Sequence, residues 1–402
     1  MLKNIIETDK KYYMNIFGDR LPVCFVKGDG MKLFTEEDDV YYDFLGGIAV
    51  NALGHNHPKF VSALKNQAEK LIHTSSLYYI ENQAKLAKKI VESTCADKVM
   101  FCNSGAEANE GAMKLAKIYF YKKGLDKYEI ITFDKSFHGR TLATVAATGQ
   151  EKYQKPYRPL LPGIKQVTPN DMSAIKEAVT DKTAAIMIEP IQGESGVHPM
   201  DEEYIRELRD FCTENNILLI FDEVQTGMGR TGHLFASQLY GVTPDIFTSA
   251  KALGGGIPIG AVCATAEVAS GFEPGDHGTT FGGNPFATAA ALAVFDLFEK
   301  EKLVENANKM GEFFKENLLK LQAKFPEEIV DVRCAGLLIG IELKPEIAKA
   351  VSAKMFEDKI LVSLCGGTTI RIAPPLIINK NDINMFVAEL STAIKYAIRK
   401  ED

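Results

Sequence analysis

The sequence predicts an α/β protein with a mainly parallel sheet, followed by a smaller α+β domain. In the middle of the chain, short apolar runs rich in β-branched residues alternate with amphipathic helical stretches. This is the pattern of βαβ units whose sheet is covered on both faces. In the last third, long helices and closely spaced strands replace the alternation. The length of 402 residues also favours more than one domain.

The elements of the middle region are buried strands and the helices that connect them. The strands are expected at Val99–Cys102, Ile130–Phe133, Ala184–Ile188, Ile217–Phe221 and Ile246–Thr248. The helices between them are expected at Glu107–Lys122, Met172–Val179 and Glu202–Asn215. Because these elements are contiguous, residues 53–285 are predicted to form one large domain.

The C-terminal residues 286–402 are predicted to form the smaller α+β domain. Its expected helices are a long one over about Phe286–Lys324 that breaks near Glu301, then Pro345–Asp358 and Asp382–Arg399. Its expected strands are Ile329–Arg333, Gly336–Glu342, Ile360–Leu364 and Thr369–Ala373. Residues 1–52 predict a helix and small hairpins, with a turn at Gly28–Gly30, and are expected to pack with this domain.

Charge and cysteine content argue against several classes of protein. Lys and Arg total 46 against 53 Asp and Glu, a formal net charge of −7, which disfavours binding to a nucleic-acid backbone. The seven cysteines are scattered without a Cys-x-x-Cys pair, so neither a zinc site nor a disulfide framework is indicated. The uncharged run His277–Phe295 contains several glycines and a proline, so it predicts a loop before a helix rather than a membrane span. Without a hydrophobic leader at the N-terminus, a cytoplasmic location is expected.

Ligands of a parallel α/β sheet bind at the carboxyl ends of its strands, so the residues after each strand are candidates for a site. The first strand is followed by Asn103–Glu110, a turn of small residues that opens a helix. Free N–H groups at such a helix N-terminus suit a phosphate. The same residues also fit a plain helix cap, with Ser104 capping and Glu107 three residues on. The sequence leaves both interpretations open.

The next two strands end in motifs that are weak by themselves. Ser136–Arg140 places an aromatic ring, an imidazole and a guanidinium on one loop. A lone histidine, however, is more often a structural hydrogen-bonding group than a catalyst. Glu189–Glu194 places two carboxylates around a turn, where Glu189 could simply end its strand in a hydrogen-bonded corner.

The last two strands supply an acid and a lysine. The strand at Ile217–Phe221 runs directly into Asp222 and Glu223, so at least one carboxylate lies at the rim of a buried sheet and needs a partner. A structural salt bridge is the alternative. Lys251 follows the next strand and leads into a glycine-rich turn. Burial there would lower the pKa of its amine and make it a candidate for a Schiff base.

Together, these strand ends offer a phosphate cradle, an aromatic ring, a carboxylate and a lysine. Pyridoxal phosphate requires this set: a helix N-terminus for the phosphate, an aromatic stacked on the ring, an acid at the pyridine nitrogen and a lysine for the aldehyde. Each motif is weak alone, but the combination is specific. The sequence therefore predicts a pyridoxal-phosphate enzyme.

Long motifs across almost the whole chain carry a family resemblance. They are DFLGGIAVNALGHNHP (Asp43–Pro58), NSGAEANE (Asn103–Glu110), SFHGRT (Ser136–Thr141), EPIQGE (Glu189–Glu194), IFDEVQTGMGRTG (Ile220–Gly232), AKALGGGIPIGA (Ala250–Ala261), HGTTFGGNP (His277–Pro285) and RIAPPLIIN (Arg371–Asn379). In this order they resemble the class III, fold-type I pyridoxal-phosphate aminotransferases, and most of all the acetylornithine aminotransferases. The resemblance implies a mainly parallel seven-stranded sheet in the large domain and a homodimer.

The resemblance implies cofactor roles for individual residues. Lys251 corresponds to the lysine that bonds to the aldehyde and then transfers a proton, and Asp222 to the acid that hydrogen-bonds the protonated pyridine nitrogen. The other implied contacts are phosphate contacts from Ser104, Gly105 and Ala106, ring contacts from Phe137 and Val224, and a 3′-oxygen contact from Gln225. Thr280 corresponds to a threonine that reaches the phosphate of the partner subunit's cofactor, which implies shared active sites. The role of His138 stays open.

The resemblance also implies a substrate. Arg140 and Arg371 correspond to arginines that bind substrate carboxylates, and Glu194 to the carboxylate that neutralises Arg371. Ile48 stands where ornithine aminotransferases carry a tyrosine that helps hold a free α-amino group, which leaves room for an acylated amine. The implied reaction, in arginine biosynthesis, converts N2-acetyl-L-ornithine and 2-oxoglutarate to N-acetyl-L-glutamate 5-semialdehyde and L-glutamate. The alternative is another ω-amino donor: ornithine, 4-aminobutyrate or succinyl-diaminopimelate.

Other hypotheses are less well supported. An aminomutase of the same class would need no second substrate. A cofactor-binding protein without catalysis is disfavoured by the intact Lys251, Asp222 and arginines. A nicotinamide dehydrogenase is disfavoured because no Gly-x-Gly-x-x-Gly follows the first strand. His55 and His57 invite a metal site, but no third ligand stands at a suitable spacing, so no metal is expected.

Overall fold

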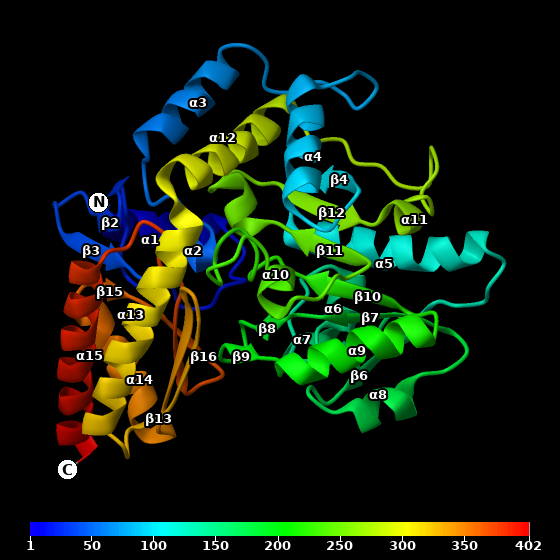
Figure 1. The fold of residues 1–402 in the computed structure, drawn as a ribbon. Coiled ribbons are helices and arrows are strands. Elements are labelled where there is room, and N and C mark those ends of the chain that lie inside the picture. The colour runs from blue at the N-terminus through cyan, green and yellow to red at the C-terminus, as the bar shows by residue number, and fades with distance from the viewer. Residues whose placement is uncertain (402) are drawn as a thin grey trace.

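The computed structural model describes residues 1–401, and its central element is a seven-stranded sheet in the order β4-β12-β11-β10-β7-β5-β6 (Figure 1). The strands are β4 (Lys98–Cys102), β5 (Glu129–Phe133), β6 (Ile164–Val167), β7 (Thr183–Ile188), β10 (Leu218–Asp222), β11 (Ile246–Ser249) and β12 (Gly260–Ala264). β12 runs antiparallel to both of its neighbours, and all the other pairs are parallel. The predicted mainly parallel, seven-stranded sheet is confirmed.

Alternate residues of β10 face opposite sides of this sheet, as the pleat of a strand requires. Leu219 and Phe221 belong to the core that includes α9 (Glu202–Glu214), whereas Leu218 and Ile220 belong to the core that includes α5 (Gly105–Lys122). Both faces are therefore covered. The carboxyl ends of the parallel strands remain as the place where a ligand can reach the sheet.

The remaining elements of the large domain are shorter. Its other helices are α3 (Pro58–Ala68), α4 (Glu81–Ser93), α6 (Leu142–Ala147), α7 (Glu151–Gln154), α8 (Met172–Ala178), α10 (Ala236–Tyr240) and α11 (Ala266–Ala269). Turns of 3₁₀ helix span Lys155–Tyr157 and Lys251–Gly254, and a hairpin consists of β8 (Ile191–Gln192) and β9 (His198–Pro199). No helix of the described residues is long and apolar enough to cross a membrane.

The long C-terminal helical stretch is divided at one residue. α12 (Pro285–Glu301) and α13 (Leu303–Lys324) flank Lys302, whose φ is +52°. α12 packs on α3 and α4 of the large domain, whereas α13 packs on the smaller domain. The predicted break near Glu301 is confirmed, and it lies where the chain passes from one part of the molecule to the other (Figure 1).

The smaller domain is built on a four-stranded sheet in the order β13-β14-β17-β16. Its strands are β13 (Ile329–Ala335), β14 (Leu338–Leu343), β16 (Ser363–Cys365) and β17 (Thr369–Ile372), and its helices α14 (Pro345–Glu357) and α15 (Lys380–Glu401). The single strand predicted over 360–364 is wrong. The chain switches sheets there, because β15 (Ile360–Leu361) pairs with the N-terminal segment and β16 pairs with β17.

The N-terminal segment contributes α1 (Leu2–Tyr12), β1 (Lys27–Asp29), β2 (Lys32–Phe34) and β3 (Val40–Asp43). These strands form a second four-stranded sheet, β1-β2-β3-β15, in which β3 pairs in parallel with β15. The first residues of the chain thus share a sheet with a strand of its last quarter. The domain boundaries at residues 52 and 285 stay a prediction.

A left-handed turn, α2 (Gly46–Ala49), follows β3. All four of its residues have positive φ, and Ile48 has a φ of +66°. A β-branched residue is rare in this region because its side chain crowds the backbone. Asp43 holds the turn: its Oδ1 accepts hydrogen bonds from the N–H groups of Leu45 and Gly46 at 2.9 and 2.8 Å. Strain that is held in place like this is typical of binding sites.

Candidate active site

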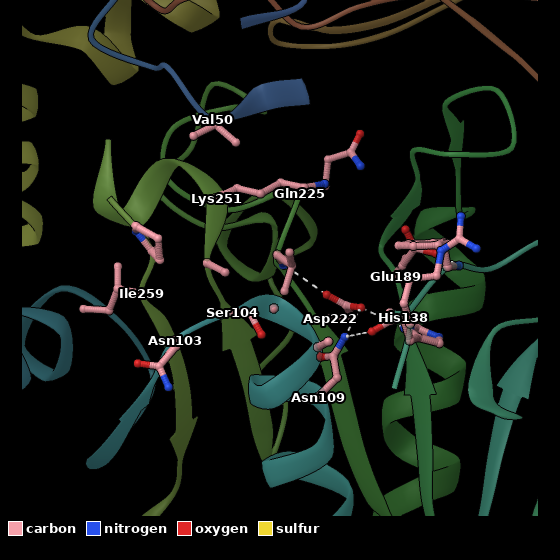
Figure 2. A pocket seen from close by; sticks show the side chains of 18 of the residues that line it. Val50, Asn103, Ser104, Asn109, His138, Glu189, Asp222, Gln225, Lys251 and Ile259 are labelled. Carbon is pink, nitrogen blue, oxygen red and sulfur yellow. Dashed lines mark hydrogen bonds and ion pairs between the residues drawn. The ribbon is translucent and has the colours of Figure 1, made fainter. Parts of the chain in front are cut away.

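A cavity of about 440 Å³ opens at the carboxyl ends of β4, β5, β7, β10 and β11 (Figure 2). Most of the residues predicted to form the site line it: Ser104, Gly105, Ala106, Phe137, Arg140, Asp222, Val224, Gln225 and Lys251. Each stands at the end of one of these strands or in the segment that follows it. The cavity therefore lies at the sheet edge that the sequence predicts.

Lys251 begins the 3₁₀ turn that follows β11, with a φ of +41°. Its Nζ makes no hydrogen bond or ion pair with any of residues 1–401. Burial lowers the pKa of Lys251 to about 8, and the positive charge of Arg371 acts in the same direction. About a tenth of the amine is therefore neutral one pH unit below this value, far more than for an exposed lysine, and a nucleophile must be neutral.

Asp222 is held in one orientation by buried donors (Figure 2). Its Oδ2 accepts hydrogen bonds from Asn109 Nδ2 and His138 Nδ1, both at 2.7 Å, and its Oδ1 accepts one from the Val224 N–H at 3.0 Å. Burial alone would lower the pKa of His138, but the hydrogen bond and charge of Asp222 more than offset this and raise it. His138 thus acts on the site by positioning Asp222.

The neighbouring acid, Glu223, has a different role. Its side chain is fully buried and accepts hydrogen bonds from the N–H groups of Ala236 and Ser237 at 2.5 and 2.8 Å. These are the first two amides of α10, so Glu223 caps that helix from a distance. Of the two adjacent carboxylates, Asp222 lines the cavity and Glu223 is structural.

The turn before α5 forms the helix cap considered from sequence, and its phosphate contacts stay a prediction. Ser104 Oγ accepts the Glu107 N–H at 3.1 Å, so Ser104 is the helix cap. The N–H groups of Gly105 and Ala106 lie in the first turn, where no intrahelical acceptor exists, and both residues line the cavity. A Cβ on Gly105 would lie 2.7 Å from Val224 Cγ1, so only glycine allows the two segments this close approach.

The donor set of the cavity fits pyridoxal phosphate. Free amides at the N-terminus of the 18-residue α5 suit the phosphate. Phe137 and Val224 offer apolar surface for a ring, and Asp222 offers a fixed negative charge. Lys251 is a buried amine with no partner among the described residues. Each requirement named for this cofactor is met by a residue lining the same cavity.

Glu189 also lines the cavity, although the sequence predicts for it only a structural role at the end of its strand. Its Oε1 accepts the Phe137 N–H at 2.7 Å, so it fixes the backbone that carries the aromatic ring. Burial raises the pKa of Glu189 to about 7, and the neighbouring Asp222 adds to this effect. The hydrogen-bonded corner considered from sequence is thus present, and it supports the site.

Arg371 and Glu194 form a buried ion pair just beyond the lining residues. Arg371 Nη1 lies 2.6 Å from Glu194 Oε1 and 3.4 Å from Gln225 Oε1, and Gln225 lines the cavity. The two side chains are 3% and 27% exposed. Burial would raise the pKa of Glu194, but the charge of Arg371 outweighs it and lowers the pKa, so Glu194 stays ionised.

Arg140 lines the cavity as a cation without an acidic partner among residues 1–401. Its guanidinium lies 3.8 Å from the ring centroid of Tyr153 and 5.3 Å from that of Phe137. Stacking on aromatic rings orients a guanidinium while leaving its N–H groups free for a carboxylate. Sequence analysis missed Tyr153, since nothing in its local pattern distinguishes it from other surface aromatics.

The other candidate residues lie outside the cavity. Thr280 is exposed on the loop before α12, and Ile48 is 45% exposed on the left-handed turn. His55 and His57 do not share a site: His55 Nε2 lies 2.8 Å from Asp43 Oδ2, and His57 pairs with a glutamate of α12. The roles of Thr280 and Ile48 stay predictions.

A family model described as "Aminotransferase class-III" matches residues 13–394. The chain belongs to the class III aminotransferases. It is 51% identical over 389 residues to the acetylornithine aminotransferase of Methanocaldococcus jannaschii, covering 96% of this chain and 97% of that protein. It is 48% identical to the acetylornithine aminotransferase of Caldanaerobacter subterraneus, covering 94% and 96%.

Solved structures of aminotransferases share the fold. The acetylornithine aminotransferase of Elizabethkingia anophelis is 35% identical, with a TM-score of 0.87 and coverage of 98% of this chain and 99% of that one. The ornithine aminotransferase of Toxoplasma gondii is 32% identical, with a TM-score of 0.95 and coverage of 100% and 96%. The protein is therefore a pyridoxal-phosphate-dependent aminotransferase.

Proposed function

We propose that this aminotransferase converts N2-acetyl-L-ornithine and 2-oxoglutarate to N-acetyl-L-glutamate 5-semialdehyde and L-glutamate, a reaction of arginine biosynthesis. The names of several relatives that are 46–51% identical support this choice of substrate. The structural observation that carries it is the buried Arg371–Glu194 pair beside the cavity.

The ion pair suits an enzyme that must accept two differently charged substrates in one site. L-Glutamate carries a carboxylate next to the reacting amino group, whereas the reacting end of N2-acetyl-L-ornithine carries none. A lone buried arginine would suit the first substrate and remain unpaired with the second, which is costly. Glu194 can neutralise Arg371 when acetylornithine is bound and give way to the α-carboxylate of glutamate.

The chain's residues divide the chemistry among themselves. Pyridoxal phosphate, when bound, supplies an aldehyde that takes up the amino group and a ring that withdraws electrons from the reacting carbon. Asp222 provides the negative charge for that ring, and the neutral amine of Lys251 accepts and returns the proton of the reacting carbon. Arg140, held by Tyr153, binds the distant carboxylate of either substrate through its free N–H groups.

Ile48 supports an acylated donor. It is apolar and offers no hydrogen bond to a free α-amino group, and the turn that carries it leads to Val50, which lines the cavity. We infer that Ile48 favours acetylornithine over ornithine. Replacement by tyrosine, Ile48→Tyr, should shift the preference toward ornithine, and it also removes a β-branched residue from a left-handed conformation.

Exposed apolar residues support the proposed homodimer. Leu71, Ile72 and Phe281 are 47%, 59% and 61% exposed, and Phe281 follows Thr280, the residue expected to reach the partner's cofactor phosphate. Light scattering of the purified protein tests this assembly, and a stable monomer with full activity would contradict it. A cytoplasmic location stays a prediction.

A donor panel tests the proposed reaction. The purified enzyme is supplied with acetylornithine, ornithine, 4-aminobutyrate or succinyl-diaminopimelate, with 2-oxoglutarate as acceptor. We expect the highest kcat/KM for acetylornithine. A higher value for another donor would assign the enzyme to that substrate, and turnover without 2-oxoglutarate would indicate an aminomutase.

A further inference from the structure

Arg230 is a fully buried arginine that the proposed chemistry does not use. It lies in the loop between β10 and α10, and its side chain is among the largest with almost no exposed surface. Its Nη1 donates to the carbonyl of Leu337 at 3.2 Å and to that of Pro374 at 2.5 Å. Its Nε and Nη2 have no hydrogen-bond partner among the described residues.

These contacts join the loop of the large domain to two segments of the smaller one. Leu337 precedes β14, and Pro374 follows Arg371 by three residues, two beyond the end of β17. The backbone of Arg230 takes part as well, since its carbonyl accepts the Leu337 N–H at 2.9 Å. One residue thus ties the loop that carries Asp222 and Gln225 to the strand that carries Arg371.

A third segment, the left-handed turn, meets the same cluster. The negative charge of Asp43, which caps that turn, opposes the effect of burial, which lowers the pKa of Arg230 to about 9. The Ala373 N–H donates to the carbonyl of Phe44 at 2.8 Å, and a Cβ on Gly46 would lie 2.7 Å from the carbonyl oxygen of Ala373. The turn that carries Ile48 is therefore packed on the segment that Arg230 holds.

Close approach of backbones shows how tightly the loop is docked. A Cβ on Gly336 would lie 2.4 Å from the carbonyl carbon of Thr231, and one on Gly229 would lie 2.8 Å from Leu376 Cδ1. Both glycines also have positive φ, so both the space and the conformation require glycine. The contact leaves little room for the two segments to move relative to each other.

Stability alone does not account for Arg230. A buried cation with unpartnered donors is costly, and apolar side chains of similar volume are often equally or more stabilising at such positions. What an apolar side chain cannot do is bond two carbonyl groups from separate segments at once. The buried arginine is therefore explained by the relative position of the segments that it holds together.

We propose that Arg230 is a positioning residue that fixes Arg371 and the Ile48 turn relative to the cofactor-binding loop. The inference rests on the proposed function, in which Arg371 and Ile48 select the substrate. It assigns Arg230 no contact with substrate. Loss of Arg230 should loosen the carboxylate site but leave the phosphate cradle at α5, which belongs to the large domain, intact.

The test measures binding of glutarate, an unreactive dicarboxylate, to the cofactor-loaded enzyme by calorimetry. In Arg230→Met we expect the Kd to rise about tenfold or more, the effect of losing a hydrogen bond to a charged group. The KM for 2-oxoglutarate should rise while kcat changes little, and retention of the cofactor, read from visible absorbance after dialysis, should be unchanged. Arg230→Lys keeps the charge but has a single donor nitrogen, so we expect its Kd for glutarate to be intermediate. This variant provides the test if Arg230→Met does not fold.

A matched control is Arg209→Met. Arg209 also bonds a backbone carbonyl and a carboxylate, of Thr243 and Asp245, but within the large domain. Its loss should lower the melting temperature without changing the Kd of glutarate. An unchanged Kd in the Arg230 variants, or a loss of cofactor that parallels the loss of glutarate, would overturn the inference. Failure of the unaltered enzyme to bind glutarate would instead contradict the proposed function, and the inference with it.

Discussion

Removing the carboxylate of Glu194 should change the choice between the two amino donors. In the proposed reaction, acetylornithine binds with the Arg371–Glu194 pair intact, whereas glutamate must exchange Glu194 for its own α-carboxylate. In Glu194→Ala the exchange is no longer needed. The kcat/KM for glutamate should therefore rise, whereas the kcat/KM for acetylornithine should not. The quantity that reports this difference is the ratio of the two kcat/KM values.

The structure sets the magnitude of the effect. Breaking a buried ion pair by removing one partner costs about 3–5 kcal/mol. Because Glu194 is 27% exposed and the carbonyl of Gly193 stays 3.2 Å from Arg371, the lower end applies, about 3 kcal/mol. Since each 1.36 kcal/mol corresponds to about a factor of ten, the ratio should shift toward glutamate by roughly a hundredfold.

Single-turnover measurements of each half-reaction, followed by cofactor absorbance, give the two kcat/KM values. The control is Glu342→Ala. Glu342 pairs with Arg333 at 2.5 Å, with side chains 30% and 13% exposed, away from the cavity. This variant should lose stability without a change in the ratio. Equal changes in both half-reactions of Glu194→Ala would refute the exchange of carboxylates on Arg371.

The remaining predictions concern cofactor binding. Because burial lowers the pKa of Lys251 to about 8 and only the neutral amine attacks an aldehyde, the rate of cofactor uptake by the apoenzyme should rise with pH, reach half of its maximum near pH 8 and level off about one unit higher; a rate that still rises steeply above that plateau would contradict this. Gly105→Ala should weaken cofactor retention about tenfold through overpacking, but have a smaller effect in a Val224→Ala background, where the Cβ has space. Asp222→Asn should fold and retain cofactor but lose most of its turnover, since it lacks the charge that keeps a ring nitrogen protonated; near-normal turnover would exclude the role. Thr280→Val should weaken cofactor retention in the partner subunit, which mixed dimers with Lys251→Ala would reveal.

The inner parallel strands were predictable because their composition is that of doubly buried strands. β10 is LLIFD and β7 is TAAIMI, apolar runs that end at the cavity. β12 was not predicted because its sequence, GAVCA, contains only one residue with a strong strand preference, Val262. Packing explains that composition: a Cβ on Gly260 would lie 2.4 Å from the Ser104 carbonyl oxygen. β6 was not predicted from sequence because it contains few apolar residues, which is typical of an edge strand.

The site residues that stand at strand ends could be predicted from sequence. Those whose place depends on packing between distant segments could not. Asp222 and Lys251 stand at or just beyond the ends of neighbouring parallel strands. The topology therefore predicts that both lie at the same edge of the sheet. Asn109, which orients Asp222, lies in the second turn of α5 and has no sequence signal. Which of the acids 222 and 223 faces the cavity depends on where α10 lies. Arg371 comes from the other sheet, and only the family resemblance connected it with Lys251.

The pairing of β3 with β15 has a consequence for how the protein is made. The two strands sit side by side, and next to them Lys359 hydrogen-bonds Asp39, a residue 320 positions earlier. A ribosome releases β3 long before β15, the strand that completes its sheet, because the elements of the large domain lie between them in the chain. The left-handed turn directly after β3 therefore gains its support late. During translation the phosphate cradle and Lys251 can assemble within the emerging large domain, so the capacity to hold the cofactor precedes the capacity to select a substrate.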